Sequence, residues 1–305
     1  MIDDAMTTLP LSLQAERLRR TPWMDVFRNA WLVLLGGVAL KAVLPAGIGN
    51  TLRPLLLLAP LLVLVAKDLS HVPDALQRTR EILRARTWRR LPAAWLPPEL
   101  VGLLELGAAQ RRGCINWLLR RPQPALPAGE AFSYLTFGAY RTGFAIVLVS
   151  TFVELPIHAL ILPLFIHDPA RLHLIHLLML VGSLSTLAWV LGDRWHVGAG
   201  SHVLTEAGLQ LRIGARAHGS IPVDAIAACE RIDQPVHAWL RRRGIERRDT
   251  VTVSPLDKPN AVLILKADSR VRLTHLGVER TGLVCVFLYL DRPQDLQKRL
   301  SALQI

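Results

Sequence analysis

Apolar residues gather into four runs that are separated by polar, mostly basic segments. The longest run is Gly143–Ile166, which has 24 residues and one formal charge, Glu154. A further run, 173–192, follows after a short polar break. Because a helix of about 20 apolar residues spans the hydrocarbon core of a bilayer, the pattern predicts that both runs are transmembrane helices.

Two shorter apolar runs, 30–46 and 51–66, come earlier in the chain and are joined by a tight connection. The apolar part of the second is Pro54–Ala66, only 13 residues, a length equally typical of an interfacial or re-entrant segment. We interpret the pair as a helical hairpin that returns the chain to the side it left. Residues 1–193 are therefore expected to form an α-helical transmembrane domain with about four spans.

The polar segments alternate in their content of lysine and arginine. The counts are 4 in the lead-in, 1 in the first loop, 12 in residues 67–142, 1 in the second loop and 17 in residues 194–305. Basic residues collect on the cytoplasmic side of a membrane protein. The alternation predicts a multi-pass protein of the cell inner membrane with both termini in the cytoplasm. It also accounts for the net charge of +12 without a nucleic-acid partner, which we do not expect.

The polar segment 67–142 is expected to be cytoplasmic and to contain two helices. One is expected at 73–88, and the other at 98–119, where Pro-Pro-Glu suits a first helical turn. Leu103 and Leu104 belong to the apolar side of the second helix. Two interpretations stay open for this pair: helices that lie against the membrane surface, or a soluble helical hairpin.

From residue 194 the pattern changes to short runs of Val, Ile, Leu and Thr that turn residues separate, which predicts β-strands. The strands are expected at 201–205, 209–213, 227–232, 250–253, 261–266 and 284–290. Asp291 then caps a last helix, expected at 293–303, with Pro293 in its first turn. Residues 194–305 are therefore expected to form a cytoplasmic, mainly-β domain that one helix closes.

Three stretches of this domain carry a family resemblance: His202–Gly214 (HVLTEAGLQLRIG), Ile221–Ile226 (IPVDAI) and Val286–Leu300, which contains the Asp-x-Pro step. In their order they resemble the bacterial pleckstrin-homology-like (PH-like) domains of membrane proteins. The resemblance covers about residues 200–303, and 234–249 looks like an insertion. It implies a binding or assembly module with no catalytic residues.

The candidate chemistry within the spans is centred on Glu154. His158 lies four residues further on the same helix face, His176 opens the next span, and Pro156 is expected to kink the helix. One interpretation is a metal-binding or proton-relaying cluster, since imidazole and carboxylate are ligands for zinc or iron. The other is a set of buried hydrogen bonds that fixes helix packing. No cofactor is predicted, and a bound metal stays open.

A second group of candidates lies within the insertion: Trp239, Arg241, Arg242 and Arg243. Tryptophan favours the membrane interface, and each arginine near an anionic leaflet contributes about 1 kcal/mol. The group is therefore a candidate for contact with the membrane surface and its anionic headgroups. A solvated loop is the other interpretation.

These patterns support two hypotheses of different classes. The first, which we favour, is a non-enzymatic inner-membrane protein that anchors a PH-like domain, which binds lipid headgroups, a protein partner or its own copies through residues 194–305. The alternative is an intramembrane metal- or proton-dependent enzyme or transporter centred on Glu154, His158 and His176. Three scattered cysteines without a CxxC motif suit a reducing compartment in both cases.

Overall fold

The computed structural model of the chain describes residues 21, 23–43, 46–88 and 91–303. The chain divides into two compact units, Met1–Val101 and Gly102–Ile305. The boundary expected after residue 193 falls inside the second unit. Most of the N-terminal lead-in and the connection at 44–45 lie outside the described residues.

The first unit contains two long helices, α2 (Trp23–Val43) and α3 (Ala46–Arg84), followed by α4 (Leu91–Trp95) and the start of α5 (Pro98–Leu118). At 1.5 Å per residue the 39 residues of α3 extend about 58 Å. The helix expected at 73–88 is present as far as Arg84, but it is the end of α3 and not a separate helix, because the chain continues through Pro73. A single proline removes only one backbone hydrogen bond, and here it does not end the helix.

Polar and aromatic side chains pack together at one end of the α2–α3 pair. Lys67 is fully buried, with its ammonium group 5.8 Å from the ring centroid of Trp23. The Trp23 ring also stacks on His71 at 5.9 Å, and the Trp23 backbone N–H donates to Glu99 Oε1 at 3.4 Å. These contacts connect α2, α3 and the first turn of α5.

The second unit contains a helical hairpin, α6 (Tyr140–Phe165) and α7 (Pro169–Val197). The Asp168 side chain caps α7 by accepting from the Ala170 backbone N–H at 3.0 Å. Both helices are long and apolar enough to cross a membrane, and only 6% of the most apolar stretch of each is buried. Within the described part of the chain, these two helices alone meet that criterion, compared with the four spans expected.

The chain after the hairpin, together with one strand before it, forms a mainly-β region with two sheets; a mainly-β structure was expected for residues 194–305. One sheet has the order β1-β2-β3-β4-β8-β9 and the other β5-β7-β10-β6. All neighbouring strands are antiparallel except β10 and β6, which are parallel. The strands are β1 (Glu130–Ser133), β2 (Ser201–Thr205), β3 (Gly208–Ile213), β4 (Ala217–Ile221), β5 (Ile226–Arg231), β6 (Thr250–Val253), β7 (Ala261–Leu265), β8 (Arg272–His275), β9 (Val278–Arg280) and β10 (Cys285–Leu288).

The six expected strands correspond to β2, β3, β5, β6, β7 and β10, and the closing helix appears as α9 (Pro293–Leu303). Residues from both sheets form one core, to which α9 contributes Leu296 and Leu300. A smaller cluster surrounds Phe287 and includes residues of α8 (Val236–Arg243).

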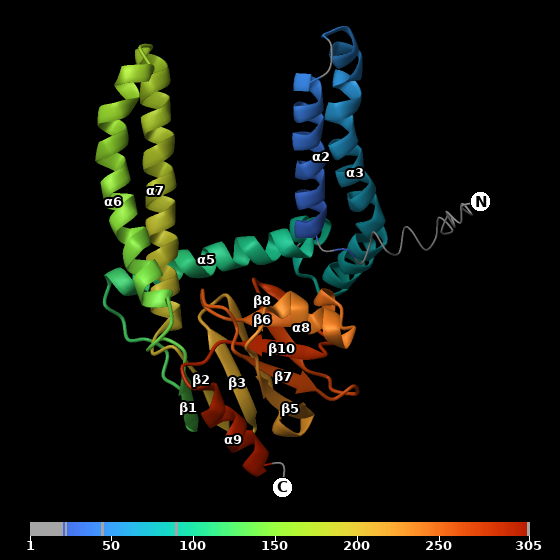
Figure 1. The fold of residues 1–305 in the computed structure, drawn as a ribbon, viewed down its shortest axis with the longest axis vertical. Coiled ribbons are helices and arrows are strands. Elements are labelled where there is room, and N and C mark those ends of the chain that lie inside the picture. Colours follow the sequence, from blue (N-terminus) through green and yellow to red (C-terminus); the bar gives the residue numbers. More distant parts are fainter. Residues whose placement is uncertain (1–20, 22, 44–45, 89–90, 304–305) are drawn as a thin grey trace, which may run out of the picture. The chain divides into compact units, whose positions relative to one another are not determined.

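Strand β1 precedes α6 in the chain, whereas its partner β2 follows α7 (Figure 1). The two strands pair antiparallel, with Phe132 opposite His202 and Ser133 opposite Ser201. The hairpin is therefore an insertion between two neighbouring strands of one sheet, so that both of its ends continue into the β region.

Candidate functional site

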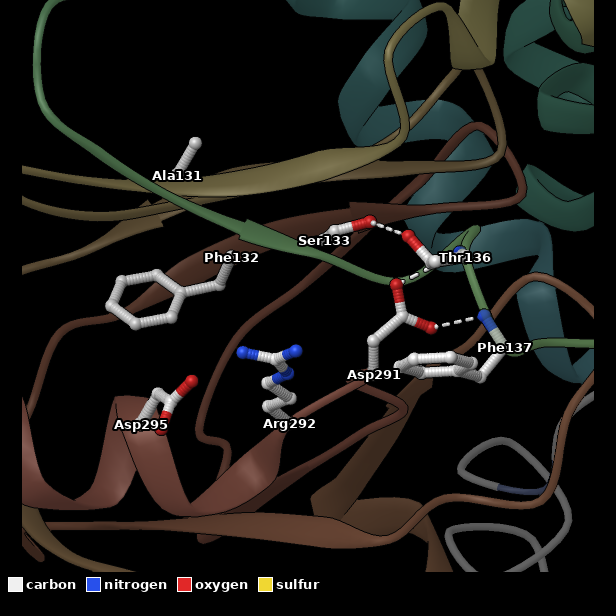
Figure 2. A pocket seen from close by; sticks show the side chains of 8 residues that line it. All are labelled: Ala131, Phe132, Ser133, Thr136, Phe137, Asp291, Arg292 and Asp295. Carbon is white, nitrogen blue, oxygen red and sulfur yellow. Dashed lines mark hydrogen bonds between the residues drawn. The ribbon is translucent and has the colours of Figure 1, made fainter.

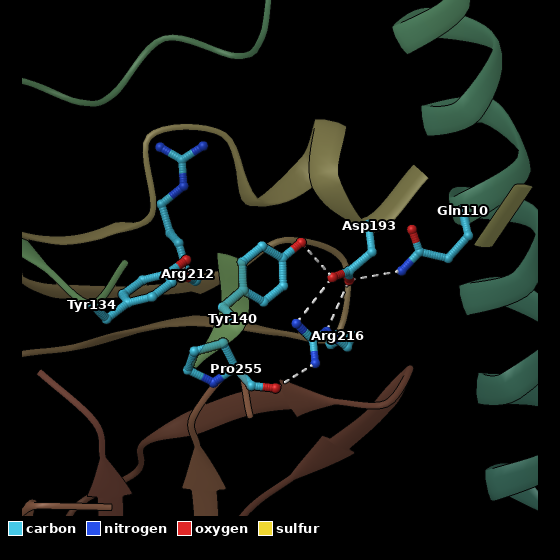
Figure 3. A network of polar contacts seen from close by, with 7 residues as sticks. All are labelled: Gln110, Tyr134, Tyr140, Asp193, Arg212, Arg216 and Pro255. Carbon is cyan, nitrogen blue, oxygen red and sulfur yellow. Dashed lines mark hydrogen bonds and ion pairs between the residues drawn. The ribbon is translucent and has the colours of Figure 1, made fainter. Parts of the chain in front are cut away.

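The α6–α7 hairpin joins the β region at a buried polar network centred on Asp193 (Figure 3). Its carboxylate accepts hydrogen bonds from the Tyr140 hydroxyl (2.9 Å) and from Gln110 Nε2 (3.2 Å). Arg216 donates through Nη2 at 3.0 Å, and its Nε lies 2.8 Å from the other carboxylate oxygen. Arg216 Nη1 also donates to the backbone oxygen of Pro255 at 2.8 Å. We refer to Gln110, Tyr140, Asp193 and Arg216 as the root network.

Each member of the root network comes from a different structural element. Tyr140 is the first residue of α6, Asp193 lies near the end of α7, Gln110 belongs to α5, and Arg216 is in the turn between β3 and β4. A buried charge is costly unless it is paired and hydrogen-bonded. The network satisfies Asp193 only while all four elements keep this arrangement, so it fixes the hairpin relative to the sheet.

Close helix packing accompanies the network. A Cβ atom at Gly192 would collide with the backbone of Gln110, and one at Gly113 would lie 2.7 Å from the Gly192 carbonyl oxygen. Only residues without a side chain permit α5 and α7 to approach so closely at this crossing.

A cavity of about 210 Å³ lies beside the root network, between the beginning of α6 and the end of α7. Its walls are mostly apolar and include Phe144, Trp189 and Leu256, while Asp193 and Arg216 form its polar side. Asp193 and Arg216 already bond to one another there. The cavity therefore offers an apolar surface with one polar side, whose charged groups are paired with each other.

A second cavity, of about 290 Å³, lies where β1 leads toward α6 (Figure 2). Asp291 accepts hydrogen bonds there from the backbone N–H groups of Thr136 (2.8 Å) and Phe137 (2.9 Å). Burial raises the pKa of Asp291, but hydrogen bonds from Phe137, Ser133 and Thr136 outweigh this effect and lower it. Asp291 is thus held as a carboxylate that ties the segment before α6 to the end of the β region.

The carboxylate of Asp257 has a similar role at the start of α6, because it accepts from the Ala139 backbone N–H at 2.7 Å. Tyr134, between β1 and α6, donates its hydroxyl to the Arg212 carbonyl oxygen at 2.7 Å. Burial raises the pKa of Tyr134 well above its usual range, so this donor stays protonated. The chain entering the hairpin is therefore fixed at several successive points.

The structure does not connect the side chains expected to act within the hairpin. Glu154 is exposed on α6, and His158 Nδ1 lies 2.6 Å from the backbone oxygen of Glu154 rather than from its carboxylate. His176 is half-buried on α7, with a buried Nε2 that has no hydrogen-bond partner. No group of three or more His, Cys, Asp or Glu side chains in the described ranges is placed to hold a metal ion. Pro156 lies inside α6.

The expected membrane-surface group divides into buried and exposed residues on α8. Trp239 is only 5% exposed and packs edge-on against Phe287 at 5.4 Å. Arg243 lies over the Trp239 ring at 4.4 Å and pairs with Glu230 at 2.7 Å. Trp239 thus packs in the core of the β region, which differs from the surface position expected for it. Arg241 and Arg242 are exposed, as a surface contact requires.

No family model, curated protein or solved structure matches the chain. Its functional interpretation rests on the geometry of its own residues.

The root network was not among the sites predicted from the sequence. The charged pair Asp193-Arg194 at the end of an apolar run was a visible signal that the span ends there. No sequence signal linked Asp193 to its partners, which lie 23, 53 and 83 residues away along the chain.

Proposed function

We propose that this chain is a non-enzymatic, multi-pass inner-membrane protein that anchors a cytoplasmic PH-like binding or assembly domain. In this proposal α2 and α3 provide two spans, α6 and α7 provide two more, and both termini are cytoplasmic. The observation that carries the proposal is the α6–α7 hairpin, an uncovered apolar element whose two ends continue into neighbouring strands of one sheet.

The exposed surface of the hairpin supports insertion in lipid. Phe152, Leu160 and Phe165 of α6 are 65%, 75% and 76% exposed, and Leu178 of α7 is 62% exposed. A surface that is apolar apart from the exposed Glu154 is unfavourable in water, whereas a helix satisfies its own backbone groups in hydrocarbon. The 26 residues of α6 extend about 39 Å, enough to cross the roughly 30 Å apolar core.

Charge supports the orientation. Residues 167–172, where the hairpin turns, contain one basic residue, Arg171 in the first turn of α7, whereas residues 67–142 contain 12 and residues 194–305 contain 17. The positive-inside rule assigns the basic segments, and with them the β region, to the cytoplasm.

The architecture of the β region supports a binding module. Two sheets enclose one core, to which the amphipathic helix α9 contributes; the order of strands followed by one closing helix is what the resemblance to PH-like domains implies. Its partner would be an anionic lipid headgroup, another protein or a second copy of this chain.

Cysteine accessibility tests the membrane arrangement. His167→Cys, in the exposed turn between α6 and α7, and Gln297→Cys, exposed on α9, are each introduced after replacing the three native cysteines. We expect a membrane-impermeant maleimide to label position 167 in intact spheroplasts and position 297 only after lysis. Equal labelling of both positions before lysis, or release of the protein from membranes by alkaline carbonate, would refute the proposal.

A further inference from the structure

Helix α5 packs one narrow face against the rest of the second unit. The buried residues on this face are Gly102, Leu106, Gln110 and Gly113. Gly102 lies against the backbone of the β8–β9 turn, and Gly113 lies against α7. The contacts of this face fix the position of α5, but they do not account for the composition of its opposite, exposed face.

The opposite face of α5 is apolar and exposed. Leu104, Ile115 and Leu118 are 58%, 54% and 62% exposed, and their spacing places them on one side of the helix. Arg111 is exposed among them on the same side, and Arg112 and Glu105 are exposed at its edge. A helix with one face on protein and an open face that combines apolar side chains with arginine suits a boundary between lipid and water, because a long arginine side chain can extend from an apolar surface to the headgroups.

The point at which α5 crosses α7 defines the level of α5 relative to the membrane that α7 is proposed to span. It falls at Gly192, the last residue of the apolar run 173–192, immediately before Asp193. Just beyond it, Trp195 Nε1 donates to the Arg121 carbonyl oxygen at 3.2 Å, at the C-terminal end of α5. If α7 spans the membrane, this level is the interface between acyl chains and headgroups, where tryptophan and arginine are favoured.

The orientation of α5 relative to the hairpin is also compatible with a helix that lies at the membrane surface. Figure 1 shows α5 running across the base of the hairpin, at the end of the β region from which α6 and α7 leave. Because its buried face contacts the β8–β9 turn, its exposed face points away from the β region.

We propose that α5 is an interfacial helix that binds the anionic phospholipids of the inner leaflet. Leu104, Ile115 and Leu118 enter the headgroup–acyl boundary, while Arg111 and Arg112 bind lipid phosphates. The inference rests on the proposed function in one respect: α6 and α7 must span the bilayer. Because the hairpin already holds α5 at the surface, docking is intramolecular and needs little intrinsic affinity.

Fluorescence quenching in vesicles tests the position of α5. The full-length chain, with its native cysteines replaced, carries one environment-sensitive fluorophore at Ile115→Cys. Matched labels are placed at Phe152→Cys, exposed midway along α6, and at Gln297→Cys on α9. The vesicles are phosphatidylcholine with or without phosphatidylglycerol, and the quenchers are aqueous iodide and lipids with a nitroxide at a shallow or a deep acyl carbon.

We expect the label at 115 to be quenched by the shallow nitroxide, the label at 152 by the deep one, and the label at 297 by iodide. Iodide quenching at 115, or protection of 115 from all quenchers, while 152 remains deep, would overturn the interfacial helix and leave the proposed function intact. Iodide quenching at 152 would show instead that the hairpin does not span, and both proposals would fail.

The double variant Arg111→Gln/Arg112→Gln tests the lipid charge. At about 1 kcal/mol for each arginine, the affinity of α5 for phosphatidylglycerol should fall about 30-fold, which weakens quenching of the label at 115 by shallow-nitroxide phosphatidylglycerol. The variant should behave as the parent does in phosphatidylcholine alone. An unchanged label at 115 in anionic vesicles would overturn the role of the two arginines.

Discussion

Asp193 holds a buried negative charge that Arg216 compensates across the junction of α7 with the β3–β4 turn. Removing one member of such a pair leaves the other uncompensated, which costs about 3–5 kcal/mol. We therefore expect Asp193→Asn to lower the free energy of unfolding by about 3 kcal/mol. Chemical denaturation of the full-length protein in detergent, followed by circular dichroism, measures this loss.

The surface pair of Asp233 and Arg231 is the matched control, because both side chains are more than half exposed. Asp233→Asn should cost less than about 1 kcal/mol. In the root network, Asp193→Asn combined with Arg216→Gln should cost less than the sum of the two single changes. Strict additivity would mean that the two side chains do not stabilise one another.

His202 makes stability dependent on pH. It is fully buried in β2, where its Nδ1 accepts from the Arg212 backbone N–H at 3.1 Å. Burial lowers its pKa from 6.5 to about 3. The unfolded chain therefore takes up this proton first on acidification, so stability is complete above pH 6.5 and falls as the pH drops toward 3. At pH 5 the loss from this residue should be about 2 kcal/mol.

His202→Asn separates this residue from His218, which is exposed, and His275, which is half-buried, because desolvation also lowers the pKa values of both. The amide oxygen of asparagine can accept the Arg212 hydrogen bond but does not titrate. The difference in unfolding midpoint between parent and variant should change steadily between pH 7.5 and pH 5. A constant difference would contradict the assignment to His202.

Glu154 and Asp193 illustrate which single residues can be predicted from the sequence. Glu154 was identified because a charge inside an apolar run is conspicuous, yet its carboxylate is exposed on the hairpin surface. Asp193 directly follows the apolar run 173–192, where a charge is not unusual, although it holds together the junction between the hairpin and the β region. The physical reason is that the cost of a charge depends on partners that only folding brings together.

At the scale of elements, the approach of α5 to α7 depends on glycine. Gly192→Ala places a methyl group against the backbone of Gln110, which cannot move aside as a side chain can. We expect a loss of about 1–3 kcal/mol, typical of overpacking, and faster labelling of the half-buried Cys114 on α5. Thermal unfolding and maleimide labelling of the full-length protein in detergent measure the two effects.

Gly182→Ala is the control on the same helix, because a Cβ atom there meets no atom within 4 Å. Alanine also favours helix relative to glycine by roughly 0.5–1 kcal/mol, so this variant should be neutral or slightly more stable. If both variants behaved alike, the close crossing would have no energetic role.

The elements that the sequence predicted share a strong local pattern. Strands such as β3 and β7 consist largely of Leu, Ile and Val and were identified within one or two residues of their ends. Strands β1, β4 and β8 contain few large apolar residues, as in AHGSI of β4, and were missed. They are strands because of their neighbours in the sheet, since pairing and burial outweigh intrinsic preference.

At the scale of the whole molecule, the sequence places a boundary where its composition changes, near residue 193. The structure continues the sheet across that point, because β1 lies before the hairpin and pairs with β2 after it. In the proposed arrangement the composition change marks the passage from lipid to water, and this need not coincide with the limits of a folding unit.

This connection predicts how fragments of the chain behave. Residues 194–305 alone lack four side chains of the core of the β region, each at most 6% exposed: Phe132, Tyr134, Leu135 and Tyr140. At about 1.5–3 kcal/mol each, their burial contributes roughly 6–12 kcal/mol, comparable with the entire stability of a typical domain. Loss of β1 also turns β2 into an open edge, which favours aggregation. We expect this fragment to aggregate or to show no cooperative unfolding.

The matched fragment keeps β1 and removes only the apolar part of the hairpin. Residues 128–143 are joined through a short Gly-Ser linker to residues 190–305, since Gly143 and Val190 line the same cavity and so lie close together. This fragment retains β1 and the root pair Asp193–Arg216, and it should remain monomeric and unfold cooperatively by size-exclusion chromatography and circular dichroism. If residues 194–305 alone unfolded cooperatively at the same midpoint, β1 would be dispensable. The hairpin would then be attached to the β region rather than built into it.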